Sequence, residues 1–146
     1  MAFERGPHLN IATFCEQVIE EKSGVLSLIR IVDRINITAS GPTVPDNMPP
    51  YTLKWYLVLA MKSGEARGTS TVKIEPELPS GIRQPPLSLS IHFEGGNRGP
   101  NLITQINMVL KEPGLYWFRI YLDDKFLTQI PVEVIFSKMI APKSQV

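Results

Sequence analysis

The residues best suited to contact a partner lie in the segment 116–121, where aromatic and charged side chains alternate. In a strand, Trp117, Arg119 and Tyr121 point to one face, because successive side chains of a strand point to opposite faces. Tryptophan, tyrosine and arginine are the types that most often dominate the binding energy of protein interfaces. The alternation therefore predicts an outward Trp–Arg–Tyr row, which either binds a partner or packs under a neighbouring loop.

Tyr56, Asn97 and Arg98 are the other candidate contacts. Trp55 continues the apolar side of its segment and is expected in the core, so the adjacent Tyr56 is expected to extend an outward patch. Asn97 and Arg98 lie in the glycine-rich loop 95–100, where they either contact a ligand or simply belong to a hairpin loop. This loop lacks the Gly-Lys-Ser/Thr ending of a phosphate-binding loop.

Two carboxylates are expected on apolar faces. Asp33 has the same parity as Ile31 and Ile35, and Glu16 stands between two apolar residues of its own parity. A carboxylate on an apolar face needs hydrogen bonds or a cation. Each of the two residues is therefore either part of a polar site at the end of the fold or a structural group, and for Asp33 a bulge that turns it outward is a further option.

The sequence offers no assembled catalytic or metal-binding set. The two histidines, His8 and His92, are far apart and have no partner at metal-ligand spacing. Cys15 would need a histidine to act as a nucleophile, and a cysteine in a β-segment is usually a small buried hydrophobe. We therefore predict no metal, no cofactor and no enzymatic activity. An enzyme of unrecognised type, built on Asp33, His8 or Cys15, is kept as an alternative.

Composition limits the class of protein. The chain has 146 residues, 15 Lys and Arg against 14 Asp and Glu, and one cysteine. These numbers argue against a disulfide scaffold, a zinc ribbon and a strongly basic nucleic-acid binder. No apolar run reaches the length of a membrane span, and the N-terminus lacks the features of a secretory signal. We expect a cytoplasmic protein that binds neither nucleic acid nor membrane, and that forms one domain over residues 1–146 with a flexible tail at 139–146.

Hydrophobic side chains recur with a period of two, which is typical of half-buried strands. Clear runs cover residues 51–62, 71–75, 87–94, 116–122 and 126–136, and a weaker alternation covers 102–110. In the last run, Phe126 and Ile130 are expected on one face. Residues 9–19 fit either a strand or a short capped helix; we prefer a strand that pairs with 25–37, a segment typical of a central strand. About eight strands predict an all-β, antiparallel sandwich.

Two segments together resemble an uncharacterised family of small bacterial proteins with an immunoglobulin-like β-sandwich. The first comprises Ala12–Glu16, Gly24–Ile29 and Val32–Arg34; the second comprises Pro113–Asp123, Leu127 and Ile130–Val134. The closing hairpin, with its Gly-x-Tyr-x-Phe pattern and acidic turn, is common in bacterial sandwich domains. The resemblance implies the fold and transfers no site.

These observations favour a non-enzymatic protein-interaction module, whose partner is another protein or a second copy of the chain. The alternative is a sandwich that binds a small ligand or carbohydrate. That alternative requires a concave face lined by Trp117, Tyr121 and Tyr56.

Overall fold

The computed structural model describes residues 3–41, 43 and 45–140, and these residues form nine strands. The strands are β1 (His8–Glu20), β2 (Leu26–Val32), β3 (Arg34–Gly41), β4 (Tyr51–Lys62), β5 (Gly68–Glu77), β6 (Leu87–Phe93), β7 (Asn101–Leu110), β8 (Gly114–Leu122) and β9 (Lys125–Ile140). No helix within this described part of the chain is long and apolar enough to cross a membrane.

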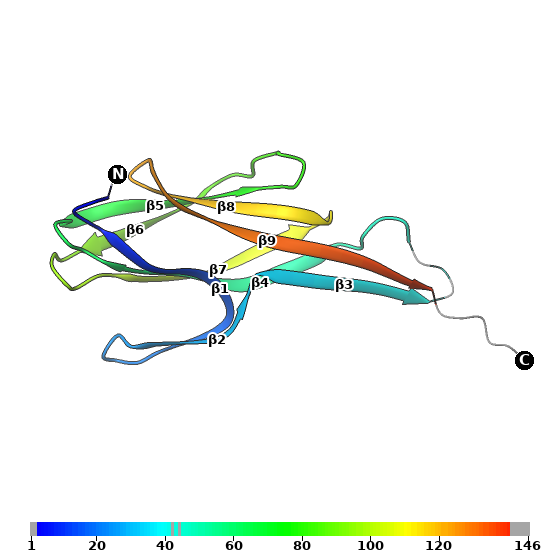
Figure 1. Ribbon diagram of the computed structural model, residues 1–146, viewed down its shortest axis with the longest axis horizontal. Coiled ribbons are helices and arrows are strands. Elements are labelled where there is room, and N and C mark those ends of the chain that lie inside the picture. The colour runs from blue at the N-terminus through cyan, green and yellow to red at the C-terminus, as the bar shows by residue number, and fades with distance from the viewer. Residues whose placement is uncertain (1–2, 42, 44, 141–146) are drawn as a thin grey trace, which may run out of the picture.

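The strands form two sheets that lie face to face (Figure 1). Sheet A has the strand order β2-β1-β4-β7, and sheet B has the order β3-β9-β8-β5-β6. The pairings between these strands are antiparallel except that of β3 with β9, which is parallel over eight residue pairs. The predicted immunoglobulin-like β-sandwich is confirmed, with nine strands rather than about eight and with one parallel pair.

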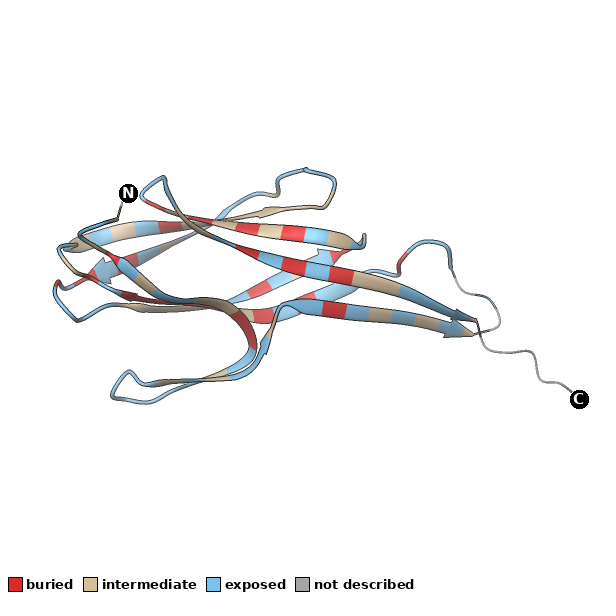
Figure 2. Cartoon of the chain, in the orientation of Figure 1, coloured by how far each residue is buried: buried red, intermediate tan, exposed pale blue. Residues whose placement is uncertain are grey.

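The core lies between the inner faces of the two sheets, where Figure 2 shows bands of buried residues. In β4, the odd-numbered residues of Leu53–Met61 are buried, as their alternation predicts. Phe14 of β1 joins the two layers, because its ring centroid lies 4.8 Å from that of Phe118 in sheet B and 5.9 Å from that of Trp55 in sheet A. The prediction that Trp55 belongs to the core is confirmed.

Residues 25–37 form two edge strands instead of the single central strand that we expected. β2 lies at the edge of sheet A and β3 at the edge of sheet B. The chain crosses between the sheets at Asp33, which belongs to neither strand. The N–H of Glu133 donates a hydrogen bond to the carbonyl oxygen of Asp33 at 3.1 Å, so the crossing is anchored to β9.

The last strand also departs from simple alternation. We expected Phe126 on the same face as Ile130, but Phe126 is 50% exposed whereas Ile130 is buried. The pairing of β8 with β9 shifts register between Ile120 and Tyr121, so that Tyr121 pairs with Phe126 and Ile120 pairs with Thr128. A bulge of this kind reorients side chains, and here it turns Phe126 outward.

Two expectations concerned the first strand, at residues 9–19, and a flexible tail at residues 139–146. Residues 9–19 lie within β1, so the strand is confirmed over the short helix. The expected flexible tail 139–146 begins inside β9, which continues to Ile140. Its remaining residues, 141–146, lie outside the described part of the chain.

We expect Phe14→Ala to lower the free energy of unfolding by about 3–5 kcal/mol, because it removes a large side chain from the contact between the sheets. Phe126→Ala is the matched control. Its ring is half exposed, and its ring centroid lies 6.0 Å from that of Tyr121, so its loss should be about 1.5 kcal/mol or less. Urea unfolding of both variants measures the difference, and equal losses would contradict the assigned core.

Candidate functional site

The predicted Trp–Arg–Tyr row lies on the outer face of sheet B. Trp117, Arg119 and Tyr121 alternate with buried residues of β8, and each is partly exposed. Arg119 forms an ion pair with Glu77 of β5. The ammonium group of Lys73 lies 4.9 Å from the centre of the Tyr121 ring, a distance at which cation and ring attract.

The charged groups around this row are paired with one another. Nη1 of Arg83 lies 3.3 Å from Oε1 of Glu75, and Nζ of Lys73 lies 3.6 Å from Oδ1 of Asp124. The arginine of the row is itself committed to Glu77. The outer face of sheet B therefore carries ion pairs in which the cations near the row are matched by carboxylates of the sheet and its adjoining loops. A contact role for the row stays a prediction.

Tyr56 lies on the other side of the sandwich. It belongs to the outer face of sheet A, where its register partners are Cys15 of β1 and Gln105 of β7. Because the sheets pack through their inner faces, their outer faces point in opposite directions. The concave site lined jointly by Tyr56, Trp117 and Tyr121, which the small-ligand alternative required, is therefore not formed.

Asn97 and Arg98 hold their own loop in place. The carbonyl oxygen of Asn97 accepts a hydrogen bond from Nζ of Lys62 at 3.4 Å, and that of Arg98 accepts one from the N–H of Ser63 at 2.8 Å. The Arg98 guanidinium lies 3.5 Å from the Glu94 carboxylate. These contacts attach the β6–β7 loop to the end of β4, and a ligand contact by either residue stays a prediction.

The two carboxylates expected on apolar faces are exposed instead. Asp33 lies at the crossing between the sheets, where the alternation of β2 is broken. The side chain of Glu16 is 41% exposed, and its Oε2 lies 2.9 Å from Nε of Arg30. The expected position of Glu16 on an apolar face is wrong, because the pairing of β1 with β2 is interrupted there, and Asp33 takes the outward position that was kept as an option.

The residues of the alternative catalytic site do not converge. His8 and Cys15 are seven residues apart in one extended strand, which corresponds to roughly 23 Å. Cys15 is fully buried, and burial raises the pKa of its thiol. Within the described residues, no group of three or more His, Cys, Asp or Glu is arranged to hold a metal ion.

The outer part of the β1–β2 hairpin is a surface that the sequence analysis missed. Beyond Cys15, β1 no longer pairs with β4 and pairs only with β2. The regular pairing is interrupted where Glu16 and Arg30 face each other. Arg30 has a φ of 57°, an uncommon conformation for a residue other than glycine. The Glu16–Arg30 ion pair therefore lies at the point where the hairpin bends.

Beyond the bend, the hairpin folds back over the outer face of sheet A (Figure 1). The side-chain amide of Asn101 in β7 donates a hydrogen bond to the carbonyl oxygen of Gly24 at the hairpin turn, at 3.1 Å. Val58 points outward from β4 yet is completely buried, which is consistent with this cover. A cleft of about 280 Å³ remains between the layers, with Ile19 on the hairpin and Tyr56 on the sheet among its lining residues.

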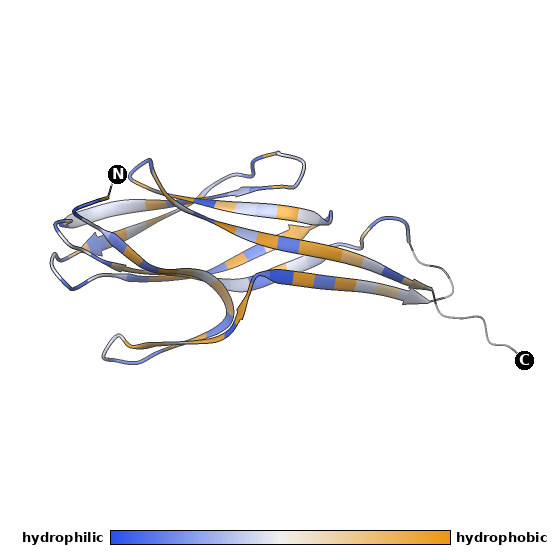
Figure 3. Ribbon diagram, viewed as in Figure 1, coloured by the Kyte–Doolittle hydropathy of each residue, from blue (hydrophilic) through white to orange (hydrophobic). Residues whose placement is uncertain are grey.

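The hairpin carries a group of exposed apolar side chains. Four of the twelve large hydrophobic residues that are exposed in the described part of the chain are Ile19, Val25, Ile29 and Ile31. We name these four residues the hairpin patch: the register of β1 with β2 places Ile19 and Ile29 on the same face, Val25 directly precedes β2, and Ile31 follows the bend at Arg30. Figure 3 shows hydrophobic residues along β2 as far as the turn. The sequence did contain a signal for this surface. In residues 25–32, both the odd-numbered and the even-numbered positions are mostly apolar, whereas a half-buried strand is apolar on one face only.

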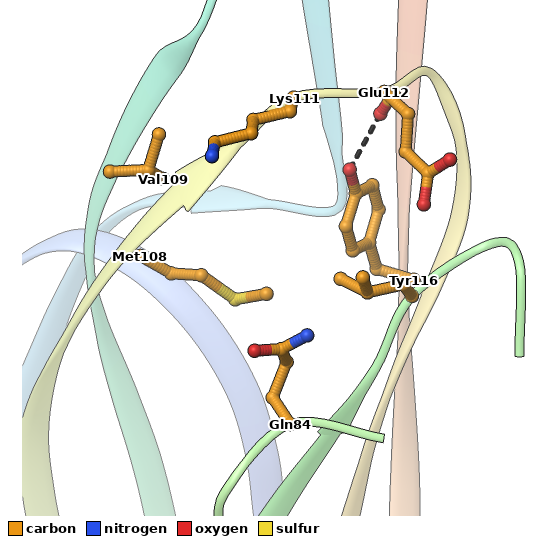
Figure 4. Close-up of a pocket in the computed structure, with 7 residues that line it drawn as sticks. Gln84, Met108, Val109, Lys111, Glu112 and Tyr116 are labelled. Carbon is orange, nitrogen blue, oxygen red and sulfur yellow. Dashed lines mark hydrogen bonds between the residues drawn. The ribbon is translucent and has the colours of Figure 1, made fainter. Parts of the chain in front are cut away.

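A second cleft opens at one end of the sandwich, between the β7–β8 turn and the loop that follows β5 (Figure 4). Its volume is about 570 Å³, and its lining includes Leu78, Met108 and Tyr116. The Tyr116 hydroxyl donates a hydrogen bond of 2.6 Å to the carbonyl oxygen of Glu112. Burial raises the pKa of Tyr116, so the hydroxyl remains protonated and able to donate. This cleft was not predicted, because its residues come from three separate segments.

We expect the Cys15 thiol to react with Ellman's reagent about tenfold or more slowly in the folded protein than in the unfolded chain, at the same pH below 9. Burial restricts access, and the raised pKa lowers the thiolate fraction at any pH below the ordinary value of 9.0. The chain unfolded in guanidinium is the control. Equal rates in the two states would show that Cys15 is an accessible, reactive thiol.

Three solved structures have a similar arrangement of strands. The first is the CARDB domain of a Pyrococcus furiosus protein in complex with di-metal ions, with 10% identity, 91% of each chain covered and a TM-score of 0.43. The second is an immunoglobulin-like protein from Pseudomonas aeruginosa, with 12% identity, 88% of this chain and 96% of the other covered, and a TM-score of 0.40.

The third structure is a β-glucosidase from Listeria innocua in complex with glucose, with 9% identity and a TM-score of 0.45; the match covers 88% of this chain and 17% of the enzyme. At such identities, these likenesses concern the fold alone. No curated protein matches the sequence.

One family model matches residues 10–135, a stretch that runs from β1 into β9. The model is described as a family of unknown function, DUF6941. This match confirms the resemblance to an uncharacterised family with an immunoglobulin-like sandwich. Because it spans most of the sequence, the chain belongs to the DUF6941 family of unknown function.

Proposed function

We propose that this domain is a non-enzymatic protein-interaction module that binds its partner through the hairpin patch. The observation that carries the proposal is that Ile19, Val25, Ile29 and Ile31 are all exposed on one hairpin, with Ile19 and Ile29 on the same face. Single exposed apolar residues are normal on protein surfaces, but a contiguous group of them is typical of an interaction site.

The hairpin also has an open edge. β2 is the outermost strand of sheet A and pairs only with β1, so one side of its backbone is unpaired. Natural edge strands are commonly protected by proline or by unpaired charges. β2 has no proline, and its single charged residue, Arg30, is engaged by Glu16. An extended segment of a partner protein can therefore add to this edge, as in known strand-addition complexes.

The hairpin gains stability from such a partner. Beyond Cys15 it consists of two strands, and an isolated two-stranded hairpin is marginally stable in water. Its attachments within the domain are the Asn101–Gly24 hydrogen bond and the half-buried contacts over sheet A. A partner that covers the hairpin patch would remove apolar surface from water and order both strands.

The test compares two variants with matched exposure, Ile31→Lys and Ile82→Lys. Ile31 is 64% exposed in the hairpin patch, and Ile82 is 60% exposed in the β5–β6 loop. Tagged wild-type protein and both variants are cross-linked in extracts of the native host, and the captured proteins are quantified by mass spectrometry. We expect Ile31→Lys to lose the specific partner by about tenfold or more, because a charge is placed in an apolar contact, whereas Ile82→Lys keeps it.

Sedimentation of the purified chain distinguishes the kind of partner. If the wild type forms a dimer that Ile31→Lys dissociates and Ile82→Lys leaves intact, the partner is a second copy of this chain. If both variants capture the same proteins at wild-type levels and have the same oligomeric state, the hairpin patch is not the contact surface and the proposal is wrong.

A further inference from the structure

The cleft at the end of the sandwich has an apolar floor and a polar margin. Leu78, Met108 and the ring of Tyr116 form the apolar part, and Gln84 and Lys111 lie at the margin (Figure 4). Its volume of about 570 Å³ is within the range of small-molecule sites, which are mostly apolar with a few polar groups that fix the ligand's orientation.

Hydrogen bonds hold both walls of the cleft in place without a ligand. On one side, the Tyr116 hydroxyl fixes the β7–β8 turn through the carbonyl oxygen of Glu112. On the other side, the N–H of Leu78 donates a hydrogen bond to the carbonyl oxygen of Ile82, and the N–H of Gln84 donates one to the carbonyl oxygen of Pro76, each at 2.8 Å. The cleft is therefore largely preformed, which reduces the entropy cost of binding.

The two walls also touch each other. Gly114, at the start of β8, packs so closely on Pro79 that an added Cβ would lie 2.7 Å from the Pro79 Cβ. Its φ of 127° is one that other residues rarely adopt, so both the space and the conformation require glycine here. This contact fixes the loop that follows β5 against the β7–β8 turn.

The charges of the cleft are separated by the Tyr116 ring. In Figure 4, the Lys111 ammonium, the Gln84 amide and the Met108 side chain lie on one side of the ring, and the Glu112 carboxylate lies on the other. The side chains of Lys111 and Gln84 have no hydrogen-bond or ion-pair partner within the described residues. The apolar part of the cleft is thus bordered by a free cation and a free amide donor.

We propose that this cleft binds a small carboxylate with an apolar body. Lys111 would bind the carboxylate by a charge-assisted hydrogen bond, and the Gln84 amide would donate a second one. The apolar body would cover Met108, Leu78 and the Tyr116 ring. This site is separate from the hairpin patch and shares no residue with it.

Octanoate is the probe, and octan-1-ol and acetate are the comparison compounds. Octan-1-ol keeps the apolar body without the charge, and acetate keeps the charge without the body. Binding is followed through the methyl resonance of Met108, assigned with Met108→Leu, and affinities are measured by titration of that signal. We expect octanoate to shift the Met108 methyl and to bind more tightly than either comparison compound.

Lys111→Gln and Lys125→Gln are the matched variants, since Lys125 is an exposed lysine at the start of β9. Lys111→Gln should weaken octanoate binding by about tenfold or more, because it removes a charge-assisted hydrogen bond, while octan-1-ol binding and the fold, seen by circular dichroism, are unchanged. Lys125→Gln should bind octanoate like the wild type. The proposal is overturned if octanoate leaves the Met108 signal unshifted up to its solubility limit, or if both variants bind octanoate equally.

Discussion

The packing of Phe14 between the two sheets determines where β1 stops being part of the sandwich. Its ring contacts Phe118 of sheet B and Trp55 of sheet A, and it has no exposure to solvent. The next residue, Cys15, is the last of β1 to pair with β4. From there the strand pairs with β2 alone, so its outer part bends away from the core, while its inner part is held by the packing of Phe14 between the layers. The position of the hairpin, and with it the cover over Val58, depends on this packing.

The surfaces of the domain differ in how far their polar groups are satisfied. On the outer face of sheet B, the arginine and lysine beside the aromatic residues are already paired with carboxylates, so a partner would have to compete with existing ion pairs. On the hairpin, the exposed groups include the apolar side chains of the hairpin patch and the backbone of an edge strand, beside charged and polar side chains. Binding there would remove apolar area from water, which is the physical reason for proposing the hairpin as the contact surface.

Much of the fold follows from the sequence because strand alternation is a local property. The runs in β4, β8 and β9 were identified from period two alone, and the inward position of Trp55 followed. The break at Asp33 could not be found in this way, because the isoleucines on both sides keep the same parity while the chain changes sheets. The outward turn of Phe126 likewise depends on a bulge in the pairing with β8.

The candidate sites were harder to predict, because they depend on contacts between distant segments. The outward face of Trp117, Arg119 and Tyr121 was predicted correctly from alternation, but the ion pair of Arg119 with Glu77 required the pairing of β5 with β8. The end cleft joins residues of β7, β8 and the loop after β5, which no local pattern connects. The hairpin patch could be suspected from the sequence, because β2 is apolar on both of its faces. A strand in the buried centre of a sheet has the same pattern, however, so the sequence alone does not distinguish the two.

The parallel pairing of β3 with β9 has a consequence for the order in which the domain assembles during synthesis. The β1–β2 hairpin pairs neighbouring segments, so it can form as soon as both have left the ribosome. Ile35 of β3, in contrast, pairs with Val134, which is synthesised about one hundred residues later. Until β9 is made, β3 has no strand beside it. β3 therefore joins sheet B only after β9 has been synthesised, and β9 then links β3 to β8.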